Sequence, residues 1–268
     1  DVAFAGPVLA ADLARRAGLT GRAGAVVAHT TDLVSAAVVT GSTTDVACVA
    51  VDPGPEDSDA LVLVADGGGY RLVRLPLTQR QPELAPASGT DLTRAVLGIA
   101  PGAPVAEVEG QTRLLTDDDL AAWSALGLAL TTADLVGGMR GVLEVTVAYA
   151  TQRTQYGVPV GSFQAVQHLL AEAHCLMEGS LSVALHAAWA VDHLPPAEAL
   201  EAARVAKAYA ARAARTVMET AVQVHGGIGN TWECIVHVYL RRALLSSQWF
   251  GDDGVALRAL ETTRLVAC

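Results

Sequence analysis

The pattern of apolar and polar positions changes about 110 residues into the chain. Before that point, short valine-rich runs occur at 25–28 (AVVA), 45–50 (DVACVA) and 60–65 (ALVLVA), separated by residues that form turns. Runs of this length between turn-forming segments are typical of strands. The segment 66–77, DGGGYRLVRLPL, predicts a hairpin. We therefore expect a small antiparallel β-domain with a short leading helix in residues 1–112.

From Thr116 onward the pattern is helical. Thr116 can cap a helix whose first turn is DDD, because acidic side chains suit the positive end of the helix dipole. This helix is expected to run to residue 149 or slightly beyond. Four further helices are predicted, at 162–194, 197–224, 231–249 and 255–266. Residues 116–268 should thus form an antiparallel helical bundle, and the fold class is α+β, mainly α.

Composition narrows the function classes. With 51% hydrophobic and 17% charged residues, the 268-residue chain can fill a sizeable core. A net charge of −10 without a basic stripe argues against nucleic-acid binding, because nucleic acid is itself a polyanion. No uninterrupted apolar span of about twenty residues and no leader pattern is seen, which predicts a cytoplasmic protein that is not in a membrane. The chain begins at Asp1 rather than Met, as a trimmed or processed product does.

Cysteine and histidine spacing does not suggest a metal site. The four cysteines lie far apart and form no C-x-x-C pair. His168 and His174 are six residues apart and so fall on different sides of a helix. No metal is therefore expected.

The end of the third long helix raises a question that capping does not answer fully. Residues 223–229 read QVHGGIG after a long alanine-rich run. Glycine adopts left-handed backbone angles at little cost, so Gly226 is explained as a helix C-cap. Gln223, Gly227 and Gly229 need another explanation.

Two stretches supply one. Residues 149–164 read YATQRTQYGVPVGSFQ, and residues 223–242 read QVHGGIGNTWECIVHVYLRR. Together they closely resemble the motifs Y-A-x-x-R-x-x-F-G-x-P-I-x-x-F-Q and Q-x-x-G-G-x-G of the C-terminal helical domain of flavin-dependent acyl-CoA dehydrogenases. The resemblance covers about residues 121–250. The preceding segment resembles the family's middle β-domain only loosely, and the family's N-terminal helical domain is absent or vestigial.

The resemblance implies an FAD site shared between two subunits. In this family one subunit's β-domain holds the flavin ring, while the neighbour's helical domain receives the pyrophosphate and adenosine. A guanidinium suits a pyrophosphate because it offers several fixed N–H donors and keeps its charge. Glycines let a cofactor lie directly against the backbone. Carried over by position, the implied cofactor-binding residues are Arg153, Gln155, Tyr156, Phe163, Gln164, Gln223, Gly226 and Gly227.

Some of the implied residues also have a purely structural explanation. Arg153 is alternatively a surface arginine at a helix end, and Gln223 a solvated helix residue. The glycine pair is alternatively a plain cap. His225 has no partner nearby in sequence, so we interpret it as a packing residue or an adenine contact rather than an acid or base.

The family's catalytic glutamate is missing from both of its usual places. The family's reaction removes the acyl α-proton with a glutamate while the β-hydride goes to the flavin. Most members carry this glutamate in the loop after the fourth helix of the domain, where this chain has Phe250. Other members carry it about twenty-six residues before the motif arginine, where this chain has Gly127. Asp252 and Asp253 are the nearest alternative carboxylates.

This combination resembles the non-catalytic partner chain of heteromeric α2β2 bacterial acyl-CoA dehydrogenases of steroid side-chain breakdown. It implies a subunit that completes the FAD site of a catalytic partner chain in trans. The substrate would be an acyl-CoA thioester and the acceptor an electron-transfer flavoprotein. Two alternatives stay open: a self-sufficient homo-oligomeric dehydrogenase, and a non-enzymatic bundle that keeps the signature for assembly. The sequence does not identify the acyl group.

Overall fold

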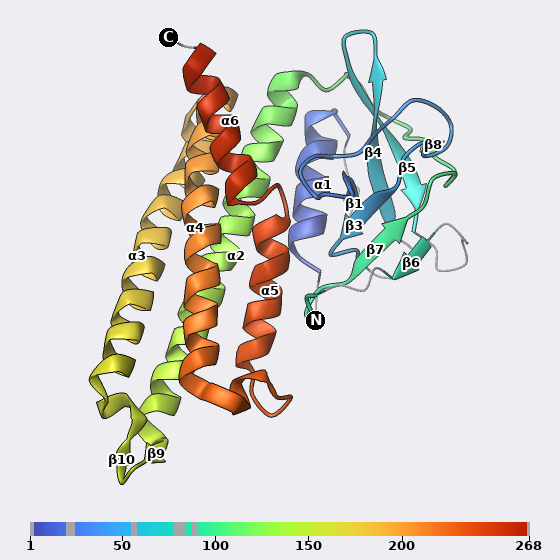
Figure 1. The fold of residues 1–268 in the computed structure, drawn as a ribbon. Coiled ribbons are helices and arrows are strands. Elements are labelled where there is room, and N and C mark those ends of the chain that lie inside the picture. The colour runs from blue at the N-terminus through green and yellow to red at the C-terminus, as the bar shows by residue number, and fades with distance from the viewer. Residues whose placement is uncertain (1–2, 20–24, 55–57, 78–83, 87–89, 267–268) are drawn as a thin grey trace. The chain divides into compact units, whose positions relative to one another are not determined.

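The computed structural model describes residues 3–19, 25–54, 58–77, 84–86 and 90–266. The chain divides into two compact units, each considered by itself below (Figure 1). The first unit comprises Asp1–Gly89, Thr93–Gly127 and Leu194–Leu200, and the second comprises Thr90–Leu92, Leu128–His193 and Glu201–Cys268. Two of the long helices contribute to both units, and the domain boundary proposed between residues 112 and 116 stays a prediction.

Besides the first turns of the two shared helices, the described residues of the first unit form helix α1 and an eight-stranded sheet, with strand order β6-β7-β3-β1-β4-β5-β8 and β2 paired beside β4. Most strand pairs are antiparallel, as predicted, but β1 and β2 both run parallel to β4. The sequence signals could not show this, because hydrophobic runs carry no strand direction. The elements are α1 (Ala5–Arg16), β1 (Val26–Thr30), β2 (Val38–Val39), β3 (Cys48–Val51), β4 (Asp59–Asp66), β5 (Gly69–Pro76), β6 (Leu84–Pro86), β7 (Val96–Ile99) and β8 (Ala106–Glu107).

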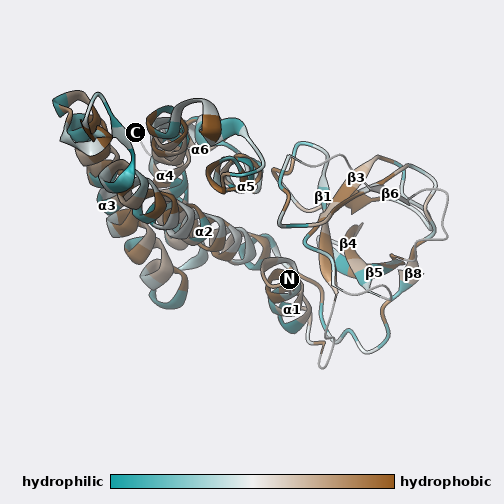
Figure 2. Ribbon diagram, turned by 90° about the horizontal axis from the view of Figure 1, so that it is seen from below, coloured by the Kyte–Doolittle hydropathy of each residue, from teal (hydrophilic) through white to brown (hydrophobic). Residues whose placement is uncertain are grey.

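The strands curve around a common apolar interior (Figure 2). The predicted hairpin is present as β4 and β5, and its turn uses Gly67 and Gly68, both with positive φ. Helix α1 packs closely on this unit at Gly6, where an added Cβ would lie 2.6 Å from the carbonyl oxygen of Val51. Trp123 is buried and donates a hydrogen bond to the carbonyl of Leu9 at 2.9 Å.

The second unit is the predicted helical bundle. Its elements are α2 (Asp117–Gln152), a two-stranded hairpin of β9 (Thr154–Gln155) and β10 (Val158–Pro159), the 3-10 turn η1 (Val160–Ser162), α3 (Gln164–His193), α4 (Pro196–His225), the 3-10 turn η2 (Gly226–Asn230), α5 (Val236–Gln248) and α6 (Asp253–Val266). Its core combines large side chains of α2, such as Leu135 and Met139, with alanines of α4, such as Ala210 and Ala214. Small residues on one helix let the larger side chains of its neighbours fill the space between them.

Two predicted helix starts were wrong. The helix expected from Ser162 begins at Gln164, because the Ser162 hydroxyl donates back to the carbonyl of Pro159 at 2.7 Å instead of capping. The helix expected from Thr231 begins at Val236. The Thr231 hydroxyl likewise donates back, to the carbonyl of Ile228 at 2.8 Å. A hydroxyl can satisfy a turn or a helix start, and the sequence does not show which.

Helix α2 is long and apolar enough to cross a membrane by length and composition, and it is the one helix among the described residues that passes this test. Half of its most apolar window is buried inside the protein. Core helices of soluble proteins pass the same test. Asp134 of α2 is ion-paired with Arg242 of α5 at 2.6 Å, as expected of a helix inside a bundle.

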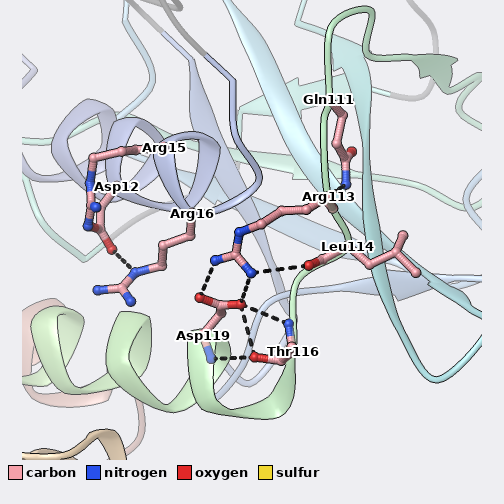
Figure 3. Close-up of polar contacts among 8 residues, drawn as sticks. All are labelled: Asp12, Arg15, Arg16, Gln111, Arg113, Leu114, Thr116 and Asp119. Carbon is pink, nitrogen blue, oxygen red and sulfur yellow. Dashed lines mark hydrogen bonds and ion pairs between the residues drawn. The ribbon is translucent and has the colours of Figure 1, made fainter.

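Helix α2 begins with the predicted Thr116 cap, to which Asp119 and Arg113 add further hydrogen bonds (Figure 3). The Asp119 N–H donates to the Thr116 hydroxyl at 3.2 Å, and the Thr116 N–H donates back to the Asp119 carboxylate at 3.0 Å. Arg113 adds two hydrogen bonds to the same carboxylate, at 2.9 and 2.7 Å. Partial burial works against ionisation of Asp119, but these donors outweigh it and lower its pKa to about 2.

We expect Asp119→Asn to lower the free energy of unfolding by about 1 kcal/mol at pH 7, a usual value for a helix cap. The carboxylate's contribution is present above its ordinary pKa of 3.8 and is lost as pH falls through about 2. The difference between the two proteins should therefore shrink over that window. Urea unfolding at several pH values measures it. Asp118→Asn, in the same helical turn but exposed, is the control, and an equal loss in both variants would contradict the assignment.

Candidate functional site

The first motif forms a tight turn at the end of α2. Tyr156 and Gly157 lie between β9 and β10 with φ of 53° and 82°. Positive φ at both central residues is the signature of a two-residue hairpin. The Arg153 N–H donates to the carbonyl of Tyr149 at 2.8 Å, and the Arg153 carbonyl accepts from the Val160 N–H at 2.7 Å. The backbone of Arg153 is thus fixed from both sides.

The side chain of Arg153 is not used by the fold. The residue is exposed, and within the described part of the chain its guanidinium has no hydrogen bond or ion pair. Gln155 is also exposed, and its amide donates to the neighbouring carbonyl of Thr154, its one hydrogen bond among the described residues. An unpaired guanidinium with a fixed backbone is well placed to bind an anion.

Two exposed aromatic rings lie beside this turn. Tyr156 is 95% exposed, and its ring meets that of Phe163 edge to face, with centroids 6.3 Å apart. Phe163 ends η1, and Gln164 follows as the exposed first residue of α3. Exposed aromatic rings are unfavourable in water unless another group covers them. The pair is therefore a candidate contact for a planar ligand or a second chain.

The second motif ends α4 with an open stretch of backbone. Gly226 has φ of 65°, which confirms its role as a helix C-cap. Gly226 and Gly227 are exposed, and a Cβ added to either would meet no atom within 4 Å. Gly229 differs, because it is buried and an added Cβ would lie 2.9 Å from the carbonyl oxygen of Val222. Packing thus explains Gly229, but not the first two glycines.

A single contact brings the two motifs together. Tyr149, one helical turn before Arg153, stacks on His225 with ring centroids 4.2 Å apart and an interplanar angle of 23°. Its hydroxyl donates to the carbonyl of His225 at 3.4 Å. His225 is buried and directly precedes Gly226. Both motifs therefore lie at the same end of the bundle, where α2 and α4 finish (Figure 1).

This end of the bundle fits part of a dinucleotide. It offers a free cation for a pyrophosphate, exposed amide side chains at Gln155, Gln164 and Gln223, and a glycine backbone open to close approach. All eight residues predicted for the cofactor lie on the surface. A ligand held by them alone would stay half in solvent. Their assignment to FAD stays a prediction.

The two positions that matter for the base are buried and apolar. Phe250 is 6% exposed, has φ of 67° and stacks on Trp249 with centroids 6.0 Å apart. Gly127 is buried within α2. Asp252, the nearest carboxylate in the chain, accepts a hydrogen bond from the Val255 N–H at 2.8 Å at the start of α6. That bond gives Asp252 a capping role.

Sequence reasoning missed one residue, Lys207. It is completely buried on α4 and hydrogen-bonded to α2 and to the end of α5. A signal was available, because Lys207 is the only lysine among the 18 lysines and arginines of the chain and lies in an alanine-rich helix. Charged side chains are rarely buried without a specific reason.

The chain is similar to a known family and to several of its members. Residues 127–263 match the family model "Acyl-CoA dehydrogenase, C-terminal domain". Acyl-CoA dehydrogenase IpdE2 of Mycolicibacterium smegmatis is 36% identical over 176 residues, 66% of this chain and 51% of that protein. Acyl-CoA dehydrogenase FadE34 of Mycobacterium tuberculosis is 37% identical over 202 residues, 74% of this chain and 27% of that protein. The chain thus spans about half, or less, of the relatives it matches.

Two solved structures share the fold. The Tcur3481-Tcur3483 steroid ACAD G363A variant has a TM-score of 0.76 and 22% identity, covering 98% of this chain and 77% of that chain. The ChsE4-ChsE5 complex from Mycobacterium tuberculosis has a TM-score of 0.62 and 23% identity, covering 92% of this chain and 64% of that chain. The predicted fold class is confirmed, and among the described residues only α1 precedes the sheet. Because the family model spans more than half of its residues, this chain belongs to the acyl-CoA dehydrogenase family.

Proposed function

We propose that this chain is a subunit of an FAD-dependent acyl-CoA dehydrogenase and completes, in trans, the FAD site of a catalytic partner chain. The observation that carries the proposal is the exposed end of the bundle. It presents the unpaired Arg153 beside the open backbone of Gly226 and Gly227. A second chain that covered this surface would enclose the cofactor and bury the exposed aromatic rings.

In this proposal the residues of the chain bind and orient the cofactor. Arg153 would hold the pyrophosphate, and the glycine backbone would lie against the neighbouring part of the dinucleotide. Tyr156 and Phe163 would close the site against water. FAD, when bound, supplies the acceptor for the substrate β-hydride.

Removal of the α-proton is assigned to the partner. Phe250 and Gly127 carry no group that accepts a proton, and both are buried. Asp252 already accepts the hydrogen bond that begins α6. The partner's carboxylate would therefore supply the acid–base contribution, typically a factor of about 10² to 10⁴.

The relatives support a proposal for the substrate class and the assembly. Both solved structures named above are designated by a pair of proteins, Tcur3481-Tcur3483 and ChsE4-ChsE5, and the first is called a steroid ACAD. By analogy we propose an α2β2 heterotetramer that acts on an acyl-CoA thioester, such as a steroid side-chain CoA. An electron-transfer flavoprotein is the proposed electron acceptor.

Two alternatives predict different behaviour. A self-sufficient homo-oligomer would need a base and a flavin-ring site outside the residues matched here. A non-enzymatic assembly subunit would keep the bundle but have no use for an unpaired Arg153. The exposure of that guanidinium favours a ligand-binding role over the second alternative.

We expect Arg153→Ala to weaken FAD retention by the complex about thirtyfold, since a charge-assisted phosphate contact contributes about 2 kcal/mol. Flavin content after serial dilution measures the loss. Arg215→Ala is the matched control, because Arg215 is an exposed arginine of α4 that pairs only locally with Glu219. Equal flavin retention in both variants would contradict the trans-binding role.

We also expect Asp252→Asn combined with Asp253→Asn to leave turnover of the complex within about threefold of wild type. Both side chains are only partly buried, and neither is assigned the proton transfer, so the rate at saturating acyl-CoA should lose less than the about 1.4 kcal/mol that a tenfold loss needs. Asn also remains a good helix cap in place of Asp252. Steady-state turnover and α-proton exchange in deuterated buffer are the measurements. Exchange that stops in this variant, but survives replacement of the partner's catalytic glutamate by Gln, would make this chain the catalytic one.

A further inference from the structure

Lys207 has no part in the function proposed above. It is the only lysine of the chain and is 0% exposed, on the buried face of α4. Burying an ammonium is costly unless its N–H groups all find acceptors. A buried lysine is therefore expected to have hydrogen-bond acceptors around its nitrogen, and these groups are held in place by the charge.

Three acceptors surround the nitrogen. Lys207 Nζ donates to the Thr131 hydroxyl on α2 at 3.1 Å, to the Trp249 carbonyl at 2.8 Å and to the Ser246 carbonyl near the end of α5. The Thr131 hydroxyl donates its own hydrogen to the Leu128 carbonyl at 3.2 Å, so it accepts from Lys207. An ammonium has three donors. Each N–H thus has its own acceptor, and α2, α4 and α5 are joined at one atom.

The Trp249 carbonyl belongs to residues 249–252, called here the 249–252 loop. Phe250 and Gly251 follow it with φ of 67° and 90°, two consecutive left-handed residues. Such a backbone is strained for phenylalanine and persists only where the surroundings hold it. The Gly251 N–H donates to the Gln248 carbonyl at 2.8 Å, and an added Cβ would lie 2.8 Å from Val255 Cγ1. From outside the loop, the hydrogen bond from Lys207 to the Trp249 carbonyl stabilises this backbone.

Charge favours this arrangement near neutral pH. Burial lowers the pKa of Lys207 to about 7, while the carboxylates of Asp134 and Asp252 act to raise it. Asp134 is itself paired with Arg242 and accepts a hydrogen bond from the Ser246 hydroxyl at 2.6 Å. The carbonyls at the C-terminal end of α5 also favour a cation. Above a pH of about 7 the side chain is a neutral amine with two N–H groups, so one of its three acceptors loses its hydrogen bond.

We infer that Lys207 is a positioning residue, whose ammonium fixes the buried 249–252 loop against α2 and so supports, from within the bundle, the surface that this chain would offer to the acyl group in the shared site. The inference rests on the proposed function for the acyl group, but its structural part does not. Lys207 links Thr131, one turn after Gly127, to Trp249, directly before Phe250. One side chain therefore spans the two places where related enzymes carry their base.

The first test follows the single lysine directly. Full-length chain carrying ¹⁵N-labelled lysine gives one side-chain nitrogen signal, whose titration reports its protonation. Thr131→Val removes one acceptor and should lower the midpoint by about one pH unit, because a hydrogen bond to the charged form favours that form. Thr132→Val is the matched control, since Thr132 is equally buried and its hydroxyl donates to the same Leu128 carbonyl at 2.7 Å. Equal midpoints in the two variants would overturn the inference.

The second test measures the loop. Lys207→Met keeps the length of the side chain without its donors, and amide exchange in the 249–252 loop should rise about tenfold while exchange in residues 210–221 stays unchanged. In the wild type, after correction for intrinsic rates, loop exchange should rise as pH passes about 7, because the ammonium is then lost. Thr131→Val should show a smaller rise and Thr132→Val none. If Lys207→Met unfolds, the comparison of the two threonine variants decides alone.

The functional part is tested in the complex with the catalytic partner. Lys207→Met and Thr131→Val should raise KM for the acyl-CoA severalfold while FAD content stays at the wild-type level. Loss of FAD together with a rise in KM would mean a general structural defect and would overturn the positioning role. These outcomes are distinguishable from a failure of the proposed function. The proposed function fails if Arg153→Ala retains FAD normally, independently of the results for the Lys207 variants.

Discussion

Close packing along the alanine face of α4 is the constraint on which the bundle depends. Ala203, Ala206, Ala210 and Ala214 are all fully buried. Because these side chains are small, α2 and α3 can fill the core with residues such as Met139 and Met177. The same packing holds the ends of α2 and α4 together, where Tyr149 stacks on His225. A bulky residue in this face would push α4 away from its neighbours, which would open the core and move the two motifs apart.

Lys207 lies in this alanine face as its one long polar side chain, and it reaches the end of α5. Lys207 and Arg153 thus serve different purposes. Hydrogen bonds consume every donor of the buried Lys207 ammonium. Arg153 has a fixed backbone and, within the described residues, an unused guanidinium, so it is the one of the two that can bind an anion.

The sequence predicted the parts of the fold that depend on local patterns. Thr116 as a cap, the glycine turn between β4 and β5, and Gly226 with positive φ all follow from local chemistry. The parallel pairing of β1 with β4 did not, because strand direction depends on contacts distant in the chain. The helices expected from Ser162 and Thr231 begin later, because both hydroxyls donate to carbonyls earlier in the chain. The motif residues were found by pattern, whereas Lys207 was missed because its acceptors are carbonyls that no sequence pattern marks.

The central claim is that this chain supplies one half of an FAD site whose other half lies on a different chain. The most direct measurement is the visible absorption spectrum of the protein purified alone and after co-expression with a catalytic acyl-CoA dehydrogenase chain. The account predicts a flavin spectrum only for the co-purified pair, with FAD in constant proportion to the two chains. A flavin spectrum in the lone chain would contradict it, and so would a stable pair that contains no flavin.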